Sequence, residues 1–371
     1  MLKSTLFSLL ITIFAVVSMA QSNTGTTKTS LKSEIIFGPE WTFTNKEILS
    51  DNPLAVEKYL NRVEAVIREK FSSYPDKIVV AASQTGGFKI TTSDGVWFEV
   101  GYDVGVLEVQ SKPLSLKQWR QKAEFVQKLI FDSMYEAGLR PNEIEGAGHV
   151  NIGFSYFRKK PGLAKKFILD YLNNPGVGIA LNGEAANDRD ARSVYQFLDD
   201  NGLLTKSRTK QFLKTIDDLE LETKIPKVSK SDQGFISYIR SKAAAIGLRG
   251  LRLIEISGTE FYELLADSCR FEMRQVRPQE SFDSYLKILE IFQARIEFLE
   301  KIPGEIKLNI PRKITDGWEV LGQFADYIDE TGLSWKDYRI LLPKVWRKLP
   351  ERNFVRKQTK IESINTCESL F

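Results

Sequence analysis

The hydrophobic pattern of the first third of the chain changes from a strand period to a helix period and back. Apolar positions over residues 35–43 predict a strand that runs through Gly38-Pro39-Glu40. Near-helical spacing over residues 52–71 then predicts an amphipathic helix. Four short β-branched or aromatic runs follow, at residues 78–80, 88–90, 96–100 and 106–109. They lie too close together for parallel crossovers, so we expect a local antiparallel meander.

The middle and end of the chain alternate between helical and strand-like patterns. Ser115 and Gln118 have the spacing of a capping box, and an apolar series continues to Gly138, which predicts a helix of about six turns. Strand-like segments are residues 148–156 and 261–274. Helical segments are residues 163–173, 191–199, 209–219 and 281–301, with two shorter helices up to about residue 349.

Strands and helices are therefore interleaved without the spacing of parallel βαβ units. This favours an α+β fold, an antiparallel β-sheet with flanking helices. No internal repeat or linker divides residues 33–345, so we expect one domain there. Residues 346–371 form a basic polar tail, whose charges favour a solvated face or frayed end.

The N-terminus has the pattern of a secretory signal peptide. Lys3 precedes an apolar run, and Ser18-Met19-Ala20 places small residues where a signal peptidase reads. We expect residues 1–20 to be removed, residues 21–32 to be a flexible leader, and the protein to be periplasmic or secreted. The alternative is a membrane anchor, but the run is about a dozen residues against the roughly 20 that span a bilayer. We therefore expect no stable membrane insertion after cleavage.

Composition narrows the function classes. The 371 residues include 52 Lys and Arg against 48 Asp and Glu, a net charge of +4 that makes nucleic acid an unexpected partner. Two cysteines exclude a disulfide scaffold, and a disulfide between them is not indicated. The single histidine, His149, excludes chemistry that needs two imidazoles.

Ionisable residues stand among apolar neighbours in four strand-like segments: Glu40, Glu108, His149, and Glu272 with Arg274. Residues two apart on a strand share a face, so Glu272 lies with Arg274 and His149 with Asn151. An uncompensated buried carboxylate is costly, and carboxylates that converge with one imidazole suit magnesium or manganese. Any one of these residues is more often structural than functional. The hypothesis of a metal site therefore rests on the order in which they follow one another along the chain.

That order consists of four short motifs. They are Gly38-Pro39-Glu40-Trp41-Thr42, then Asp103 before Glu108-Val109-Gln110-Ser111-Lys112-Pro113, then Gly148-His149-Val150-Asn151, and finally Glu272-Met273-Arg274 ahead of a long helix. The series resembles the carboxylate-amine ligases of the glutamine synthetase and glutamate-cysteine ligase superfamily, especially the amidoligase branch. The likeness runs from about residue 34 to residue 300.

The resemblance implies a glutamine synthetase-like catalytic fold and an ATP- and Mg-dependent ligase. Glu40, His149 and Glu272 would hold the metal on the ATP phosphates, and Glu108 with Asp103 would serve a second metal. His149, Asn151 and Arg274 would contact the cofactor, with Arg274 and Glu108 as catalytic residues. Small-molecule or peptide carboxylates and amines would be the substrates, joined through an acyl phosphate.

Two positions depart from the family pattern and keep other hypotheses open. Thr42 stands where the family has a second Glu, and Asn151 where it has a second His. An exported, catalytically altered or inactive relative that binds an anionic ligand is therefore an alternative. A third hypothesis treats the three glutamates as buried ion-pair partners of Arg274. Further arginines that could contact acidic substrates are Arg249, Arg252, Arg270 and Arg277.

Overall fold

The fold was analysed in a computed structural model, which describes residues 34–74, 77–84, 86–141, 148–160, 162–182, 193–205, 207–210, 212, 224–226, 235–240, 244–256, 259–264, 269–309, 311–314 and 316–356. The segments expected to be signal peptide and leader lie outside these residues, as does Cys367. The described residues from Ile35 onward belong to one compact unit.

A nine-stranded antiparallel sheet runs through this unit. Its strands are β1 (Ile36–Phe43), β2 (Ile78–Ala82), β3 (Phe88–Thr92), β4 (Trp97–Asp103), β5 (Val106–Ser111), β6 (Leu114–Ser115), β7 (Gly148–Gly153), β9 (Ile246–Arg249) and β12 (Arg270–Val276). Their order is β2-β3-β4-β5-β1-β7-β12-β9, and β6 pairs with β1. The local meander β2–β5 and the antiparallel sheet predicted from the sequence are confirmed.

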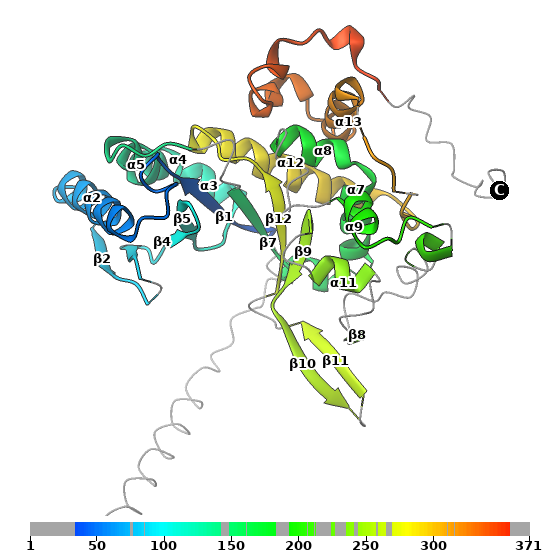
Figure 1. Cartoon of the computed structure of the whole chain (residues 1–371), viewed down its shortest axis with the longest axis horizontal. Coiled ribbons are helices and arrows are strands. Elements are labelled where there is room, and N and C mark those ends of the chain that lie inside the picture. The colour runs from blue at the N-terminus through cyan, green and yellow to red at the C-terminus, as the bar shows by residue number, and fades with distance from the viewer. Residues whose placement is uncertain are drawn as a thin grey trace, which may run out of the picture. The chain divides into compact units, whose positions relative to one another are not determined.

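A second sheet has three strands, β8 (Lys224–Pro226), β10 (Leu251–Ile256) and β11 (Thr259–Leu264). The hairpin β10–β11 extends away from the nine-stranded sheet (Figure 1). The single strand predicted over residues 261–274 is therefore wrong, because β11 pairs within the hairpin and β12 pairs with β7 and β9. Periodicity marks both segments as strands but does not assign them to a sheet.

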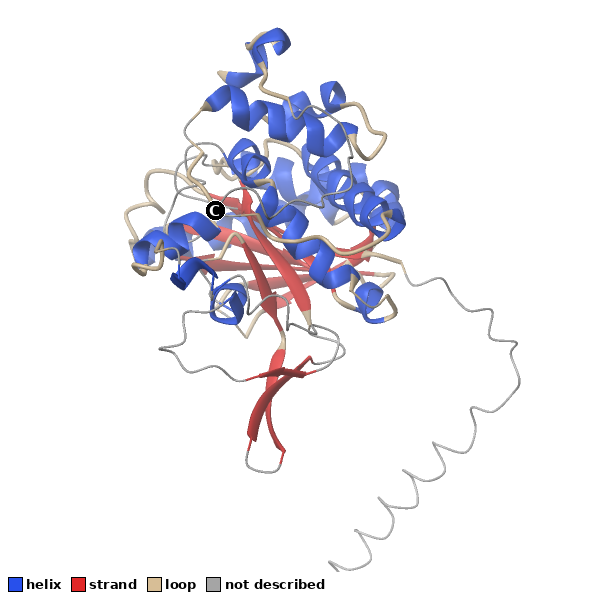
Figure 2. Cartoon of the chain, turned by 90° about the vertical axis from the view of Figure 1, so that its right-hand side faces the viewer, coloured by secondary structure: helices blue, strands red, loops and turns tan. Residues whose placement is uncertain are grey.

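Most helices lie over one face of the nine-stranded sheet (Figure 2). They are α2 (Pro53–Phe71), α3 (Leu116–Gln121), α4 (Ala123–Val126), α5 (Ser133–Glu136), α6 (Ser155–Arg158), α7 (Leu163–Asn173), α8 (Pro175–Asn182), α9 (Val194–Asp200), α11 (Phe235–Arg240), α12 (Phe282–Lys301) and α13 (Gly317–Asp329), followed by a 3₁₀ segment, Trp335–Leu341. The side chains of Asn52 and Ser281 cap α2 and α12. The mixed architecture with flanking helices is thus as expected.

The helix predicted after Ser115 is interrupted. The capping box of Ser115 and Gln118 is present, but α3 ends at Gln121 and a π-helical segment, Gln127–Asp132, separates α4 from α5. The strand expected over residues 148–156 ends at Gly153, where α6 follows. The helix expected over residues 191–199 begins at Val194, and most of the segment 209–219 lies outside the described residues.

An aromatic cluster between β1 and α12 forms the centre of the core. The ring of Trp41 packs edge-on against Trp119, Phe131, Phe282 and Tyr285, with centroids 5.7–6.2 Å apart. Because side chains alternate along a strand, burying Trp41 on the helix-covered face turns its neighbours Glu40 and Thr42 to the other face. The core thereby sets the direction of the polar side chains.

The packed unit continues past residue 345. Phe354 is buried against the ring of Trp335, with centroids 5.1 Å apart, and the Nε atom of Arg356 lies 2.8 Å from Asp326. Part of the segment assigned to the tail by its composition therefore packs on α13 and the 3₁₀ segment. Within the described residues, no helix combines the length and apolar character needed to span a membrane.

Candidate functional site

Cross-strand register brings the distant polar residues of the sequence together. Glu40 on β1 pairs with His149 on β7, and Asn151 on β7 pairs with Glu272 on β12. The Nδ1 atom of His149 lies 3.1 Å from Oε2 of Glu40 and 3.6 Å from Oε1 of Glu272. Three adjacent antiparallel strands therefore place these side chains on one face.

Glu40, His149 and Glu272 have the geometry of a metal-ligand set. One ligand atom from each of them lies within 4.8 Å of the other two. Their side chains are only 11–13% exposed, so water cannot fully solvate the charges. The donors are two carboxylate oxygens and one imidazole nitrogen, which suit a divalent cation such as magnesium or manganese.

Two arginines neutralise Glu272. The Nη1 atom of Arg274 lies 2.7 Å from Oε1, and Arg249 on β9 donates from Nε to Oε2. Burial raises the pKa of the Glu272 carboxyl, but Arg249, His149 and Arg274 outweigh burial and lower it. A register shift between Met273 and Val276 accompanies the turn of Arg274 toward Glu272. Glu272 therefore stays ionised in the folded protein.

Asn151 bridges Arg270 and Glu40. Its Nδ2 atom donates to Oε1 of Glu40 at 2.7 Å and to the carbonyl of Gly38 at 3.2 Å. Its Oδ1 atom accepts from Nε of Arg270 at 2.8 Å. The amide oxygen is the ligand atom that Asn would offer to a metal, and here it faces a guanidinium group. Asn151 therefore orients Glu40.

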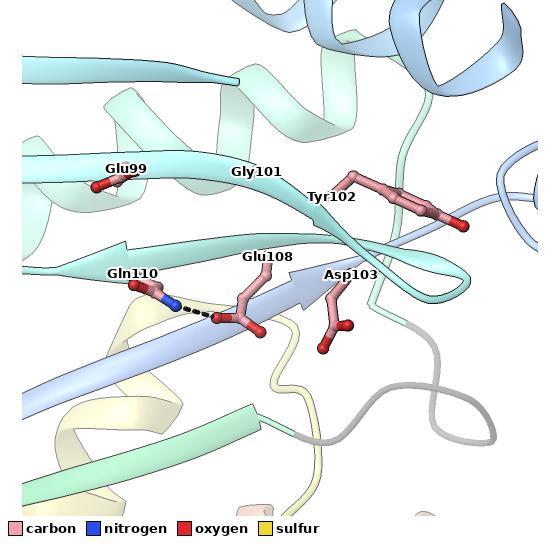
Figure 3. Close-up of a pocket in the computed structure, with 6 residues that line it drawn as sticks. All are labelled: Glu99, Gly101, Tyr102, Asp103, Glu108 and Gln110. Carbon is pink, nitrogen blue, oxygen red and sulfur yellow. Dashed lines mark hydrogen bonds between the residues drawn. The ribbon is translucent and has the colours of Figure 1, made fainter. Parts of the chain in front are cut away.

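Glu108 and Asp103 lie apart from this set, at a cavity of about 250 Å³ lined by Glu99, Gly101, Tyr102, Asp103, Glu108 and Gln110. The carboxylates of Asp103 and Glu108 point to the same side of the β4–β5 hairpin, and the ring of Tyr102 points away from them (Figure 3). Burial, followed by the negative charge of Glu40, raises the pKa of the Glu108 carboxyl, although the hydrogen bond from Gln110 acts against both. The pKa of Glu108 therefore depends both on its burial and on the nearby charge of Glu40.

Sequence reasoning missed Glu99 and Gln110. Glu99 shares a strand face with Asp103, and Gln110 pairs with both Glu99 and Glu40. The hairpin turn at Gly105 provided a signal, because it fixes which residues of β4 and β5 face each other.

The other arginines divide between the site and the core. Arg249 and Arg270 are cross-strand partners on β9 and β12; Arg249 and Arg274 contact Glu272, and Arg270 contacts Asn151, so all three guanidinium groups border the polar face on its β12 side. Arg277 is 3% exposed and donates to the carbonyls of Leu341 and Leu342, so the expectation that it contacts a substrate is wrong. The side chain of Arg252 lies outside the described part of the chain.

The polar face therefore has an acidic end at Asp103 and Glu108 and a basic end at Arg249, Arg270 and Arg274. Glu40, His149 and Asn151 lie between the two ends. Comparison with protein-family models finds no family that matches the chain, and comparison with curated proteins finds no matching sequence.

Proposed function

We propose that the protein is an ATP- and Mg-dependent carboxylate-amine ligase of the glutamine synthetase and glutamate-cysteine ligase superfamily, with the glutamine synthetase-like catalytic fold. The observation that carries this proposal is the convergence of Glu40, His149 and Glu272 within 4.8 Å on one face of an antiparallel sheet. These are three of the positions to which the sequence resemblance gives metal-ligand roles.

The donor set fits the cofactor that the proposal requires. Glu40, His149 and Glu272 would hold magnesium or manganese, which would supply positive charge against the ATP phosphates. The low exposure of the three side chains strengthens such interactions, because little water competes. Asn151 donates a hydrogen bond to the Glu40 carboxylate and thereby orients it before any ligand binds.

The reaction needs charge neutralisation and removal of a proton. The carboxylate oxygen of one substrate attacks the γ-phosphorus of ATP and displaces ADP, which gives an acyl phosphate. The amine nitrogen then attacks the acyl carbon, releases inorganic phosphate and loses a proton. Arg274, which contacts Glu272, would neutralise the transferred phosphoryl group, and Glu108, whose pKa is raised by burial and by the charge of Glu40, would accept the proton.

One observation favours a second candidate function, an exported protein that binds an anionic ligand without ligating it. Both carboxylate oxygens of Glu272 already contact guanidinium groups, and Thr42 supplies no carboxylate. Arg249, Arg270 and Arg274 would then receive the anion. In either case the proposal retains export directed by residues 1–20.

Calorimetric titration with ATP, with and without magnesium, tests the proposal. We expect magnesium-dependent binding to the wild type and to Glu57→Gln, an exposed control on α2, and its loss in Glu272→Gln. Absence of nucleotide binding to all three proteins would contradict the ligase. Binding of an acidic ligand without nucleotide would support the second function.

A further inference from the structure

The side chain of Arg249 reaches Glu272 across a glycine. Arg249 lies on β9, and Gly247, two residues earlier on the same strand, is the cross-strand partner of Glu272 on β12. Residues two apart on a strand share a face, so the side chain of Arg249 passes over Gly247 to contact Glu272. A Cβ atom built on Gly247 would lie 2.8–2.9 Å from Nη2, Cζ and Nη1 of Arg249. The absence of a side chain at position 247 therefore makes room for the guanidinium group.

Two acceptors hold this guanidinium group in place. The Nε atom of Arg249 donates to Oε2 of Glu272, and its Nη1 atom donates to the backbone carbonyl of Arg240 at 3.2 Å. Arg240 is the last residue of α11, where helix carbonyls lack an intrahelical partner. The side chains of Arg249 and Glu272 are only 16% and 11% exposed, so water screens their attraction little. Arg249 is therefore a fixed counter-ion of Glu272.

The charges around the proposed metal ligands balance one another. Glu40 and Glu272 contribute two negative charges. Arg249 and Arg274 both contact Glu272 and contribute two positive charges. The imidazole of His149 is neutral when it coordinates a metal, so it adds no charge. A divalent cation would therefore give this set a net positive charge, which opposes its binding in a site with little water.

Both carboxylate oxygens of Glu272 accept from a guanidinium group. The Nη1 atom of Arg274 lies 2.7 Å from Oε1, and Arg249 donates to Oε2. A metal ion that coordinates Glu272 would therefore meet a positive charge at either oxygen. Arg274 shares β12 with Glu272, whereas Arg249 belongs to β9, and its long side chain can turn away while the two strands stay paired. Arg249 is thus the guanidinium group that is better placed to leave.

We infer that Arg249 competes with the divalent cation for Glu272 and thereby sets how tightly the site binds metal. This inference rests on the metal-ligand role that the proposed function gives to Glu272. An anion such as a phosphate group would attract the guanidinium group away from Glu272, so metal and anion would each strengthen the binding of the other. Arg249 therefore selects a metal that arrives with an anionic ligand over a metal ion alone.

Calorimetric titration of the mature protein with manganese alone, without nucleotide, tests this inference. Arg249→Gln removes the charge and keeps an amide donor, so we expect it to bind manganese roughly tenfold or more tightly than the wild type. Arg249→Lys keeps the charge and should stay close to wild-type affinity. Gly247→Ala pushes the guanidinium group away without altering any charge, and it should also bind manganese more tightly. Arg352→Gln, which replaces an exposed arginine, is the control that should keep wild-type affinity.

The outcomes separate this inference from the proposed ligase. Equal or weaker manganese binding in Arg249→Gln and Gly247→Ala would overturn the inference, because Arg249 would then position Glu272 rather than compete for it. Absence of manganese binding in all the proteins would overturn it as well. Tighter manganese binding in these two variants, without ATP binding to any protein, would uphold the competition while the ligase fails. Circular dichroism of each variant checks that it folds, and Gly247→Ala decides the matter if Arg249→Gln does not.

Discussion

The hydroxyl oxygen of Tyr285 lies where a side chain on Gly148 would have to be. A Cβ atom built on Gly148 would come within 2.0 Å of Tyr285 Oη, and Tyr285 itself is fully buried on α12. Gly148 precedes His149, so this close contact sets how near the helix lies to the strand that carries the imidazole. The glycine directly before His149 therefore has a steric reason in this fold.

Gly148→Ala should destabilise the protein. A rigid buried ring cannot move away cheaply, so we expect the free energy of unfolding to fall by about 1–3 kcal/mol, as for overpacked cores. Chemical denaturation measures this change. Tyr285→Phe in the same background should recover part of the loss, and Gly317→Ala, where nothing lies within 4 Å, should show no loss. Equal stability of Gly148→Ala and the wild type would contradict the steric argument.

Breaking a buried ion pair between two helices should also lower the free energy of unfolding. Asp170 on α7 accepts two hydrogen bonds from Arg295 on α12, at 2.5 and 2.8 Å, and both side chains are at most 6% exposed. Asp170→Ala would leave Arg295 with only Glu330 and the carbonyl of Tyr327 as partners, so we expect a loss of about 3 kcal/mol in urea unfolding, the lower end of the range for a broken buried pair. The exposed pair of Lys58 and Glu47 is the comparison, and Glu47→Ala should lower the free energy of unfolding far less than Asp170→Ala does.

Metal binding should stabilise the folded protein through His149. Manganese added at about 100 times its dissociation constant should stabilise the wild type by roughly 2.7 kcal/mol, and a chelator should remove the gain. His149→Gln should lose most of this response in a thermal-shift measurement, whereas Glu57→Gln should retain it. A full response in His149→Gln would place the metal elsewhere in the protein.

Asp94 gives a prediction about pH. Hydrogen bonds from Lys122 and then Thr92 lower the pKa of its carboxyl from 3.8 to about 2. Because the folded-state pKa is below the usual value, the contribution to stability is present above about pH 4 and is lost as pH falls through about 2. The side chain is 52% exposed, so solvent screening keeps the effect small, under about 1 kcal/mol. Unfolding curves of Asp94→Asn should differ from wild type at pH 6 and converge near pH 2.

Local features of this fold could be predicted from sequence because neighbouring residues determine them. The capping box of Ser115 depends on Gln118 three residues later, and the meander depends on closely spaced strands joined by turns. The interrupted helix could not be predicted in the same way. Apolar positions three or four residues apart suit a continuous helix, and in the sequence this apolar series continues without a break through Gln127–Asp132, the residues of the π-helical segment.

The sequence predicts which residues belong to the candidate site better than it predicts the distances between them. Alternation places Glu40, His149 and Glu272 on polar strand faces, but the register that joins β1, β7 and β12 depends on pairings distant in sequence. For the same reason the separation of Glu108 and Asp103 from Glu40, His149 and Glu272 could not be derived, nor the contact of Asn151 with Arg270. These distances follow from sheet order, which the hydrophobic pattern does not encode.

The sheet order also has a consequence for folding kinetics. The strands β2 to β5 follow one another along the chain, so their pairings close short loops and can form early. Glu40 and His149 are 109 residues apart, and their contact requires β7 to join β1 across that long loop. The charged set on the polar face is thus assembled late, and a partly folded chain that already has its meander would still lack a competent site.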